Sequence, residues 1–180
     1  MRKRYFTLGL FATAALFTLT AVRAADPDTT SLEGKPAPDI SLKTLDGKDF
    51  KLADEKGNVV VVDFWATWCP PCRESLPHLN KLAGNKDLAE KGLKVFAVDA
   101  QEESPAVKAF VSKNSYTFTV PLDANGDAMK QYKVVGIPTT VVVGRDGTIK
   151  KVFVGYGGEE SAKALDSAVE AALKDPKPAK

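Results

Sequence analysis

The sequence has 180 residues, enough for one domain with a hydrophobic core, and carries 25 Lys and Arg against 23 Asp and Glu, for a net charge of +2. Four of the basic residues, Arg2, Lys3, Arg4 and Arg23, lie within the first 24 positions, which contain no acidic residue. The other 156 residues therefore hold 21 basic and 23 acidic side chains, a net charge of −2, which excludes a basic nucleic-acid-binding domain.

The first 24 residues have the pattern of a secretory signal peptide. A basic start is followed by an apolar run over residues 5–22, and Val22-Arg23-Ala24 offers small residues where a signal peptidase cleaves, before Ala25. The run is also about long enough to cross a bilayer, so residues 5–22 could instead remain as an uncleaved membrane anchor. In either case we expect the rest of the chain to be periplasmic or otherwise extracytoplasmic.

One α/β domain is expected over residues 36–174, between a polar lead-in (residues 25–35) and a disordered, solvated tail (residues 175–180). Near the start of the domain, an Asp-Gly pair supplies the positive φ of a tight turn. The segments on either side of this turn, residues 39–43 and 49–52, are therefore expected to form a β-hairpin.

The most apolar segment of the domain is residues 59–64, which is almost continuously apolar and β-branched. This pattern is typical of a central strand that is covered on both faces. A helix is expected to follow from Cys69 or Pro70. Its apolar stripe consists of Leu76, Leu79 and Leu82 or Ala83.

The second half of the domain continues the alternation of strands and helices. A buried strand is expected over residues 93–99, and Ser104 is expected to cap a helix that starts at Pro105. The elements expected after it are a strand at 117–120, a short helix at 126–131, a hairpin of 139–143 and 148–154, and an amphipathic helix at 159–173. This order predicts a mixed α/β domain of three layers.

Cys69 and Cys72 are the only cysteines of the chain and lie where the central strand gives way to the helix. A cysteine at a helix N-terminus meets unpaired backbone N–H groups and the helix dipole, which both stabilise the thiolate that attacks disulfides. The second cysteine lies one turn further and is close enough to form a disulfide with the first. Pro70 and Pro71 stiffen the loop and suit early helical positions, where a backbone N–H is not needed.

Three other uses of the cysteine pair have to be weighed. A zinc site would need a second pair of ligands, and His78 is the only histidine. A purely structural disulfide would gain little stability, because so short a loop restricts the unfolded chain only slightly. A pair of inert thiols does not suit an oxidising compartment. We therefore expect a redox-active pair, with no metal ion and no organic cofactor.

The residues around the cysteines carry a family resemblance. Residues 62–72, Val-Asp-Phe-Trp-Ala-Thr-Trp-Cys-Pro-Pro-Cys, resemble the active-site segment of thioredoxins, and residues 135–139, Val-Gly-Ile-Pro-Thr, resemble their cis-proline loop. Pro77 matches a helix-kinking proline of that family. The Lys-Pro-Ala-Pro-Asp segment at 35–39, the hairpin and the export signal resemble the TlpA/ResA branch of periplasmic or membrane-anchored oxidoreductases, many of which serve cytochrome c maturation.

This resemblance covers about residues 36–173. It implies a thioredoxin fold, which is a three-layer α/β/α domain with a central mixed β-sheet, here with an N-terminal β-hairpin extension. It also implies that the cysteine pair cycles between a dithiol and a disulfide.

Two positions depart from the usual pattern of the TlpA/ResA branch. Many members have glutamate three residues after the second cysteine, where this chain has Ser75, with Glu74 one place earlier. Many also have asparagine where this chain has Asp63, which matches the buried acid of thioredoxin. Because Asp63 lies among valines and aromatics, burial is expected to raise its pKa and to suit it to exchange protons with Cys72 near neutral pH. The alternative is an ordinary aspartate that caps the following turn.

The resemblance also implies a substrate-binding surface beside the cysteines. Pro138 is expected to be cis and to lie next to Cys69, which leaves backbone groups of Ile137 free to pair with an extended peptide. The other residues expected on this surface are Trp68, Pro70 and Pro71. Trp65 is expected in the core, and His78 on the flank of a helix.

The expected function is that of an exported thiol:disulfide oxidoreductase, acting as a reductase of protein disulfides. Cys69 attacks the substrate, Cys72 resolves the mixed disulfide with help from Asp63, and the Cys69–Cys72 disulfide results. The expected partners are a disulfide-containing protein substrate and a membrane thiol-disulfide electron donor. The protein is expected to be a monomer.

Other functions of the same fold are the alternatives. A copper-site assembly protein usually has three residues between its cysteines and a distant histidine, whereas two residues separate them here and no histidine follows His78. A thiol peroxidase has threonine three residues before its reactive cysteine, where this chain has Ala66. A binding module without enzymatic activity is the third alternative.

Overall fold

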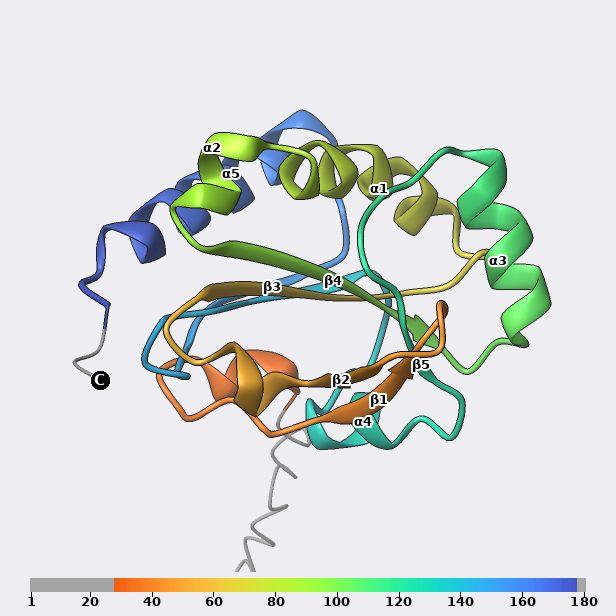
Figure 1. Cartoon of the computed structure of the whole chain (residues 1–180), viewed down its shortest axis with the longest axis horizontal. Helices are drawn as coiled ribbons and strands as arrows, with labels where there is room; N and C mark the ends of the chain where they lie inside the picture. The colour runs from red at the N-terminus through yellow and green to blue at the C-terminus, as the bar shows by residue number, and fades with distance from the viewer. Residues whose placement is uncertain (1–27, 178–180) are drawn as a thin grey trace, which may run out of the picture.

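The computed structural model describes residues 28–177 (Figure 1). The expected signal peptide or anchor, the start of the lead-in and the end of the tail lie outside these residues. Within residues 28–177, seven strands form one mixed sheet in the order β2-β1-β5-β4-β3-β6-β7. The strands are β1 (Ser41–Thr44), β2 (Asp49–Lys51), β3 (Val59–Trp65), β4 (Leu93–Ala100), β5 (Pro121–Asp123), β6 (Thr139–Val143) and β7 (Ile149–Val154).

Two short 3-10 helices and five α-helices accompany the sheet in the described part of the chain. They are η1 (Thr29–Leu32), η2 (Leu52–Glu55), α1 (Pro70–Ala83), α2 (Lys86–Glu90), α3 (Ser104–Lys113), α4 (Asp127–Gln131) and α5 (Glu159–Lys174). None of the helices between residues 28 and 177 has the length and apolar character of a transmembrane span.

Strand β3 lies inside the sheet, parallel to β4 and antiparallel to β6. All seven of its residues are buried, as the apolar pattern of this segment predicts. Its side chains alternate between the two faces of the sheet. Those packing on one face include Val59, Val61 and Trp65, and those packing on the other are Val60, Val62 and Phe64.

The two faces of the sheet are covered by different elements. Figure 1 shows α1, α2 and α5 together on one side of the sheet and α4 on the other. The first core contains apolar residues of α1 and α5, among them Leu76 and Leu165, and also Val107 of α3. The second contains Leu32 of η1, residues of the N-terminal hairpin and Tyr132, which follows α4. The domain therefore has the three layers expected from the sequence.

The N-terminal part of the domain is held more firmly than a polar lead-in suggests. Thr29 and Leu32 of η1 are buried. The hydroxyl of Thr29 donates to the carbonyl of Lys133 at 3.0 Å, and the N–H of Gly34 donates to the carbonyl of Ile149 at 2.8 Å. The lead-in thus packs on the domain from residue 29, through the buried Leu32 and these two hydrogen bonds. The hairpin of β1 and β2 then extends the sheet through β5, as expected.

Three other elements differ from the sequence-based prediction. Ser104 is the first residue of α3 and not its cap, a shift of one position. The segment 117–120 makes an isolated bridge, between Phe96 and Thr119, and the strand β5 forms just after it. Its apolar residues pack into the core without forming a ladder. Helix α2 has no buried residue, so the hydrophobic pattern gives no sign of it.

Arg145, in the turn between β6 and β7, is a cation with only 5% of its surface exposed. Its Nε donates to the carbonyl of Asp175 at 3.0 Å, Nη1 to that of Gly57 at 2.9 Å, and Nη2 to those of Lys91 at 2.7 Å and Leu173 at 3.2 Å. Carbonyls at a helix C-terminus lack partners within the helix. The planar guanidinium therefore joins the end of α5 to the segments that precede β3 and β4.

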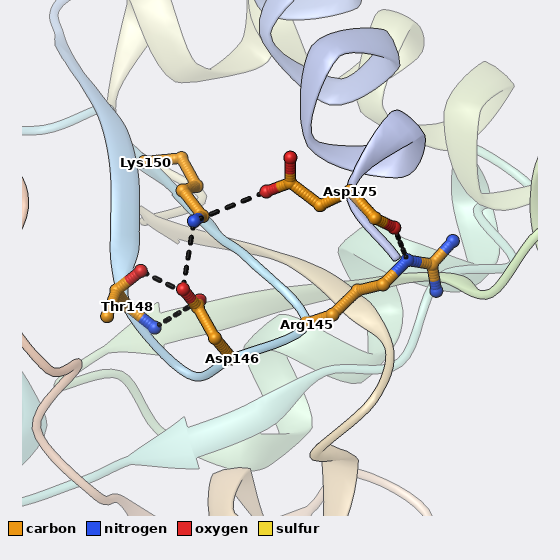
Figure 2. Close-up of polar contacts among 5 residues, drawn as sticks. All are labelled: Arg145, Asp146, Thr148, Lys150 and Asp175. Carbon is orange, nitrogen blue, oxygen red and sulfur yellow. Dashed lines mark hydrogen bonds and ion pairs between the residues drawn. The ribbon is translucent and has the colours of Figure 1, made fainter. Parts of the chain in front are cut away.

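Figure 2 shows a second set of contacts at the same place. The carboxylate of Asp146 accepts the N–H and the hydroxyl of Thr148, at 3.0 and 2.7 Å, and lies 3.0 Å from Nζ of Lys150. The same Nζ lies 3.3 Å from the carboxylate of Asp175. The sequence predicts that Asp175 begins a disordered tail, but both its carbonyl and its carboxylate hold it to the domain.

Arg145→Met is expected to lower the free energy of unfolding by about 2–4 kcal/mol, because four carbonyls on three segments lose a charged donor. Arg145→Lys should not restore stability, since one ammonium group cannot reach carbonyls on three segments. As a control, Lys150→Met removes partly exposed ion pairs and should change stability by less than about 1 kcal/mol. Urea unfolding of the oxidised protein measures all three, and wild-type stability of Arg145→Lys would contradict this account.

Candidate active site

The two cysteines form a disulfide between the end of β3 and the start of α1. The sulfur atoms of Cys69 and Cys72 are 2.08 Å apart. Cys69 is the N-cap of α1, and its sulfur accepts the backbone N–H of Cys72 at 3.2 Å. After reduction, this N–H and the positive end of the helix dipole favour a thiolate on Cys69. Residues 66–72, which connect the strand to the helix and contain both cysteines, are the disulfide loop.

The cysteines are shielded from solvent, but their surroundings are not. Cys69 is 2% exposed and Cys72 is 0% exposed, whereas Trp68 is 66% exposed and Val135, in the segment before β6, is 76% exposed. Pro70 is also exposed. Exposure in the oxidised protein therefore does not distinguish the two cysteines. They differ in position, because Cys69 caps the helix and Cys72 lies inside it.

Ile137 and Pro138 lie beside the disulfide. The peptide bond between them is cis, as the sequence predicts. The carbonyl oxygen of Ile137 is 3.7 Å from Sγ of Cys69. Pro138 is buried, and its own carbonyl accepts the N–H of Gly155 at 2.8 Å. This segment, far along the chain from the cysteines, is thus fixed against the first of them.

Asp63 lies within β3 and is fully buried. Its side chain shares a sheet face with Val61 and Trp65, which pack in the same core as both cysteines. One carboxylate oxygen accepts the hydroxyl of Thr140 at 2.6 Å, and the other, Oδ2, has no hydrogen-bond partner among the described residues. Burial raises the pKa of Asp63 to about 7, although the hydrogen bond from Thr140 acts in the opposite direction. Asp63 is therefore a buried acid and does not cap a turn.

Among the described residues, no positive charge compensates that of Asp63. In the sheet it pairs with Ala97 of β4 and Thr140 of β6. Ser75 is buried, and its hydroxyl donates to the carbonyl of Cys72 at 2.9 Å. Glu74 is exposed. Of the acids considered from the sequence, only Asp63 is buried in the core that contains the cysteines.

Trp65 and His78 make contacts that hold elements of the fold together. Trp65 is fully buried, and its Nε1 donates to the carbonyl of Ala97 at 3.1 Å, which agrees with the expected core position. Nε2 of His78 lies 2.8 Å from the carboxylate of Asp166, so this half-buried residue links α1 to α5. Between residues 28 and 177, no group of three or more His, Cys, Asp or Glu side chains is arranged to hold a metal ion.

The sequence analysis did not identify three polar groups close to this site. Thr140 is the hydrogen-bond partner of Asp63. Glu102 accepts two hydrogen bonds from Thr67, in the disulfide loop. Asp99, at the end of β4, is fully buried. Asp99 shows the same signal as Asp63, an acid in an apolar strand, whereas the contacts of Thr140 and Glu102 span 77 and 35 residues and leave no local pattern.

The profile of the family described as Redoxin matches residues 32–171. The chain belongs to the Redoxin family. It is 38% identical to the thiol-disulfide oxidoreductase ResA of Bacillus thuringiensis subsp. konkukian (strain 97-27). The 133 aligned residues cover 74% of each of the two chains. It is 41% identical to the thioredoxin-like protein YneN of Bacillus subtilis (strain 168). These 126 aligned residues cover 68% of this chain and 72% of YneN.

A solved structure of a thioredoxin family protein has the same architecture. A thiol:disulfide interchange protein of the thioredoxin family from Chlorobium tepidum TLS matches with a TM-score of 0.66 and 31% identity, over 77% of this chain and 95% of that chain. The expected thioredoxin fold is therefore confirmed. This member of the Redoxin family is a thiol–disulfide oxidoreductase, an enzyme class that its relatives share and that its cysteine disulfide suits.

Asp63→Asn tests the raised pKa of the buried acid in this Redoxin-family enzyme. The folded protein holds the Asp63 proton up to about pH 7, whereas the unfolded chain loses it near the ordinary value of 3.8, so wild-type stability falls as pH rises through this window. The free energy of unfolding of the variant relative to wild type should therefore increase by about 2–4 kcal/mol between about pH 4 and pH 8. Urea unfolding of the oxidised proteins measures this difference.

The exposed Asp54 provides a matched control. Asp54→Asn removes a carboxylate at the surface, so the rise between about pH 4 and pH 8 should be larger in Asp63→Asn than in Asp54→Asn. An equal change in the two variants would show that Asp63 titrates normally in the folded protein.

Proposed function

We propose that this protein is an exported reductase of protein disulfides, in which Cys69 attacks the substrate and Cys72 resolves the product. The observation that carries the proposal is the disulfide at the N-terminus of α1, which shares one core with the buried Asp63. Burial, and not a neighbouring cation, sets the pKa of this acid. The exchange needs neither a metal ion nor an organic cofactor, because sulfur atoms alone change partners.

The reaction proceeds in two exchanges. The Cys69 thiolate attacks one sulfur of the substrate disulfide, forms a mixed disulfide and releases the first substrate thiolate, which takes a proton from water. Cys72 gives its proton to the carboxylate of Asp63 and attacks Sγ of Cys69. This step releases the second substrate thiolate and leaves Cys69–Cys72 oxidised. Two electrons pass to the substrate, and a dithiol donor must return them to the enzyme.

Asp63 suits this step because of its protonation equilibrium. A pKa of about 7 allows the carboxyl group to accept a proton and to release it again near neutral pH. Its Oδ2, which has no partner among the described residues, is the atom available for the proton. The hydroxyl of Thr140 holds the other oxygen and so orients the carboxyl group.

The surface around the disulfide suits a protein substrate. Trp68 and Val135 are large, exposed apolar side chains near the cysteines and the cis-proline segment. The backbone N–H of Ile137 makes no hydrogen bond within residues 28–177 and is free to pair with an extended chain. Pro70 and Pro71 form the rim of the same surface. Apolar contact and one or two backbone hydrogen bonds would hold a segment around the substrate disulfide.

The charge near the cysteines supports the reductive direction of electron flow. Strong oxidants of this kind owe their power to a highly stabilised thiolate in the reduced form. A buried carboxylate makes a second negative charge in the same core less favourable, so the thiolate is stabilised only modestly. The helix N-terminus acts in the opposite direction, but it is common to cysteines in this position. The enzyme therefore donates electrons to its substrate.

The setting of this reaction is outside the cytoplasm. The leader is either cleaved after residue 24 or kept as an anchor over residues 5–22. Electrons for a reductase in that compartment come across the membrane, so the donor is a membrane thiol-disulfide protein and the substrate a disulfide-containing protein. The branch resemblance favours cytochrome c maturation as the pathway, with the enzyme acting as a monomer.

Cys72→Ser is expected to trap a mixed disulfide with insulin through Cys69, whereas Cys69→Ser should trap none and lose insulin reduction. In the reduced wild type, Cys69 should react with iodoacetamide at least about tenfold faster than Cys72, because the helix terminus stabilises its thiolate. Mass spectrometry of the labelled peptides measures both results. Equal labelling, or a mixed disulfide formed through Cys72, would reverse the assignment of the two cysteines.

The reduction potential of the Cys69–Cys72 pair is expected near that of thioredoxin, about −270 mV, and far from the value of about −120 mV of the strong oxidant DsbA. Asp63→Asn should lower the thiol pKa values, make the potential less negative and slow resolution of the mixed disulfide. Equilibration against glutathione buffers measures the potential. A wild-type value more oxidising than about −180 mV would contradict the reductase direction and leave the enzyme class intact.

A further inference from the structure

A carboxylate outside the cysteine pair holds the disulfide loop. Glu102 lies between β4 and α3, and its two oxygens accept the backbone N–H and the hydroxyl of Thr67, each at 2.5 Å. Thr67 is two residues before Cys69 and directly before the exposed Trp68. Two hydrogen bonds to a charged group fix both the backbone and the side chain of this residue. Glu102 therefore anchors the part of the loop that carries the reactive surface.

The backbone around Glu102 is shaped to bring it back onto the end of β4. The N–H of Glu102 donates to Oδ2 of Asp99 at 3.1 Å. Between these two residues, Gln101 has a φ of 61°, in the left-handed region that side-chain-bearing residues rarely adopt. Backbone strain of this kind persists only where the surrounding structure enforces it, and it is often found at functional sites.

Asp99 is a buried carboxyl group that faces the carboxylate of Glu102. It is 0% exposed, and its Oδ1 has no hydrogen-bond partner among the described residues. A further charged group near Asp99 is Asp123 of β5, whose oxygens accept two N–H groups of the first turn of α4. From β3, the residue paired with Asp99 is the uncharged Trp65. Facing carboxyl groups without a cation are stable when they share a proton.

We propose that Glu102 is a positioning residue for thiol–disulfide exchange: together with a proton shared with Asp99, it clamps Thr67 and so fixes the loop that presents Trp68 and Cys69. This inference rests on the exchange activity and not on the direction of electron flow. Glu102 does not touch the reacting sulfur atoms in this assignment and acts only through Thr67.

The shared proton makes the clamp sensitive to pH. Burial raises the pKa of Asp99 to about 7, and the side chain of Glu102 and the charge of Asp123 act in the same direction. The hydrogen bond from the backbone N–H of Glu102 acts in the opposite direction. Below this pH, Asp99 is protonated and donates to Glu102. Above it, a second negative charge faces Glu102 and weakens its hold on Thr67. The loop is therefore held most firmly in the more acidic part of the neutral range.

Amide hydrogen exchange at Thr67 in the oxidised protein tests the clamp directly. After correction for intrinsic exchange, Thr67 protection in the wild type should fall at least about threefold between about pH 6 and pH 8. Glu102→Ala should reduce protection at least about tenfold at pH 6. Asp99→Asn, whose amide mimics the protonated acid, should keep protection high and remove the fall with pH. Glu103→Ala, a change in the exposed neighbouring residue, should behave as wild type.

The reaction of the reduced enzyme with a peptide disulfide provides the second readout. Its rate constant should fall at least about threefold in Glu102→Ala and remain at the wild-type value in Glu103→Ala. Unchanged Thr67 protection in Glu102→Ala would overturn the proposal, as would a wild-type fall with pH in Asp99→Asn. If Glu102→Ala does not fold, the pH dependence of Asp99→Asn decides alone. A wild type that reacts with no disulfide would refute the oxidoreductase activity, and Thr67 protection would still decide whether the clamp exists.

Discussion

Helices α1 and α5 cover one face of the sheet, and the N-terminal elements together with α4 cover the other, so every side chain of β3 is buried. A polar group in such a strand keeps its charge only at a large cost in solvation. Asp63 is the residue on which this constraint acts, and its chemistry follows from its place in the strand more than from any partner. The next residues of the same strand lead directly to the disulfide loop, where the chain first reaches the surface. Burial of one strand thus sets both the protonation of the acid and the position of the cysteines.

The neighbouring strand repeats this arrangement at its end. Asp99 pairs with Trp65 in the sheet, two positions beyond Asp63 along β3. Both acids are buried, both have an oxygen without a hydrogen-bond partner among the described residues, and both have a pKa raised to about 7. Each raised pKa contributes stability at low pH that is lost as pH rises toward 7. The protein retains two destabilising groups at one end of the sheet, which is expected of functional positions and not of a core optimised for stability.

The sequence predicts the parts of this structure that depend on local pattern. Continuous apolar residues identify β3, an Asp-Gly pair identifies the N-terminal hairpin, and the cysteine spacing at a strand–helix junction identifies the disulfide. Segment 117–120 has the right composition for a strand, but its position in the core is decided by packing and not by pairing. The contacts of Thr140 and Glu102 join residues far apart in the chain, so only the folded topology brings them to the site.

The buried guanidinium of Arg145 has a practical consequence for handling the protein. Arg145 lies just after the C-terminal end of β6. The N-terminal end of β6 lies next to the cis-proline segment and the disulfide. Because Arg145 binds the carbonyls at the end of α5, the C-terminal end of the described chain is fixed at the end of the sheet away from Cys69. A fluorophore, an affinity tag or a solid support coupled at the C-terminus would therefore leave Trp68 and Val135 accessible to large substrates.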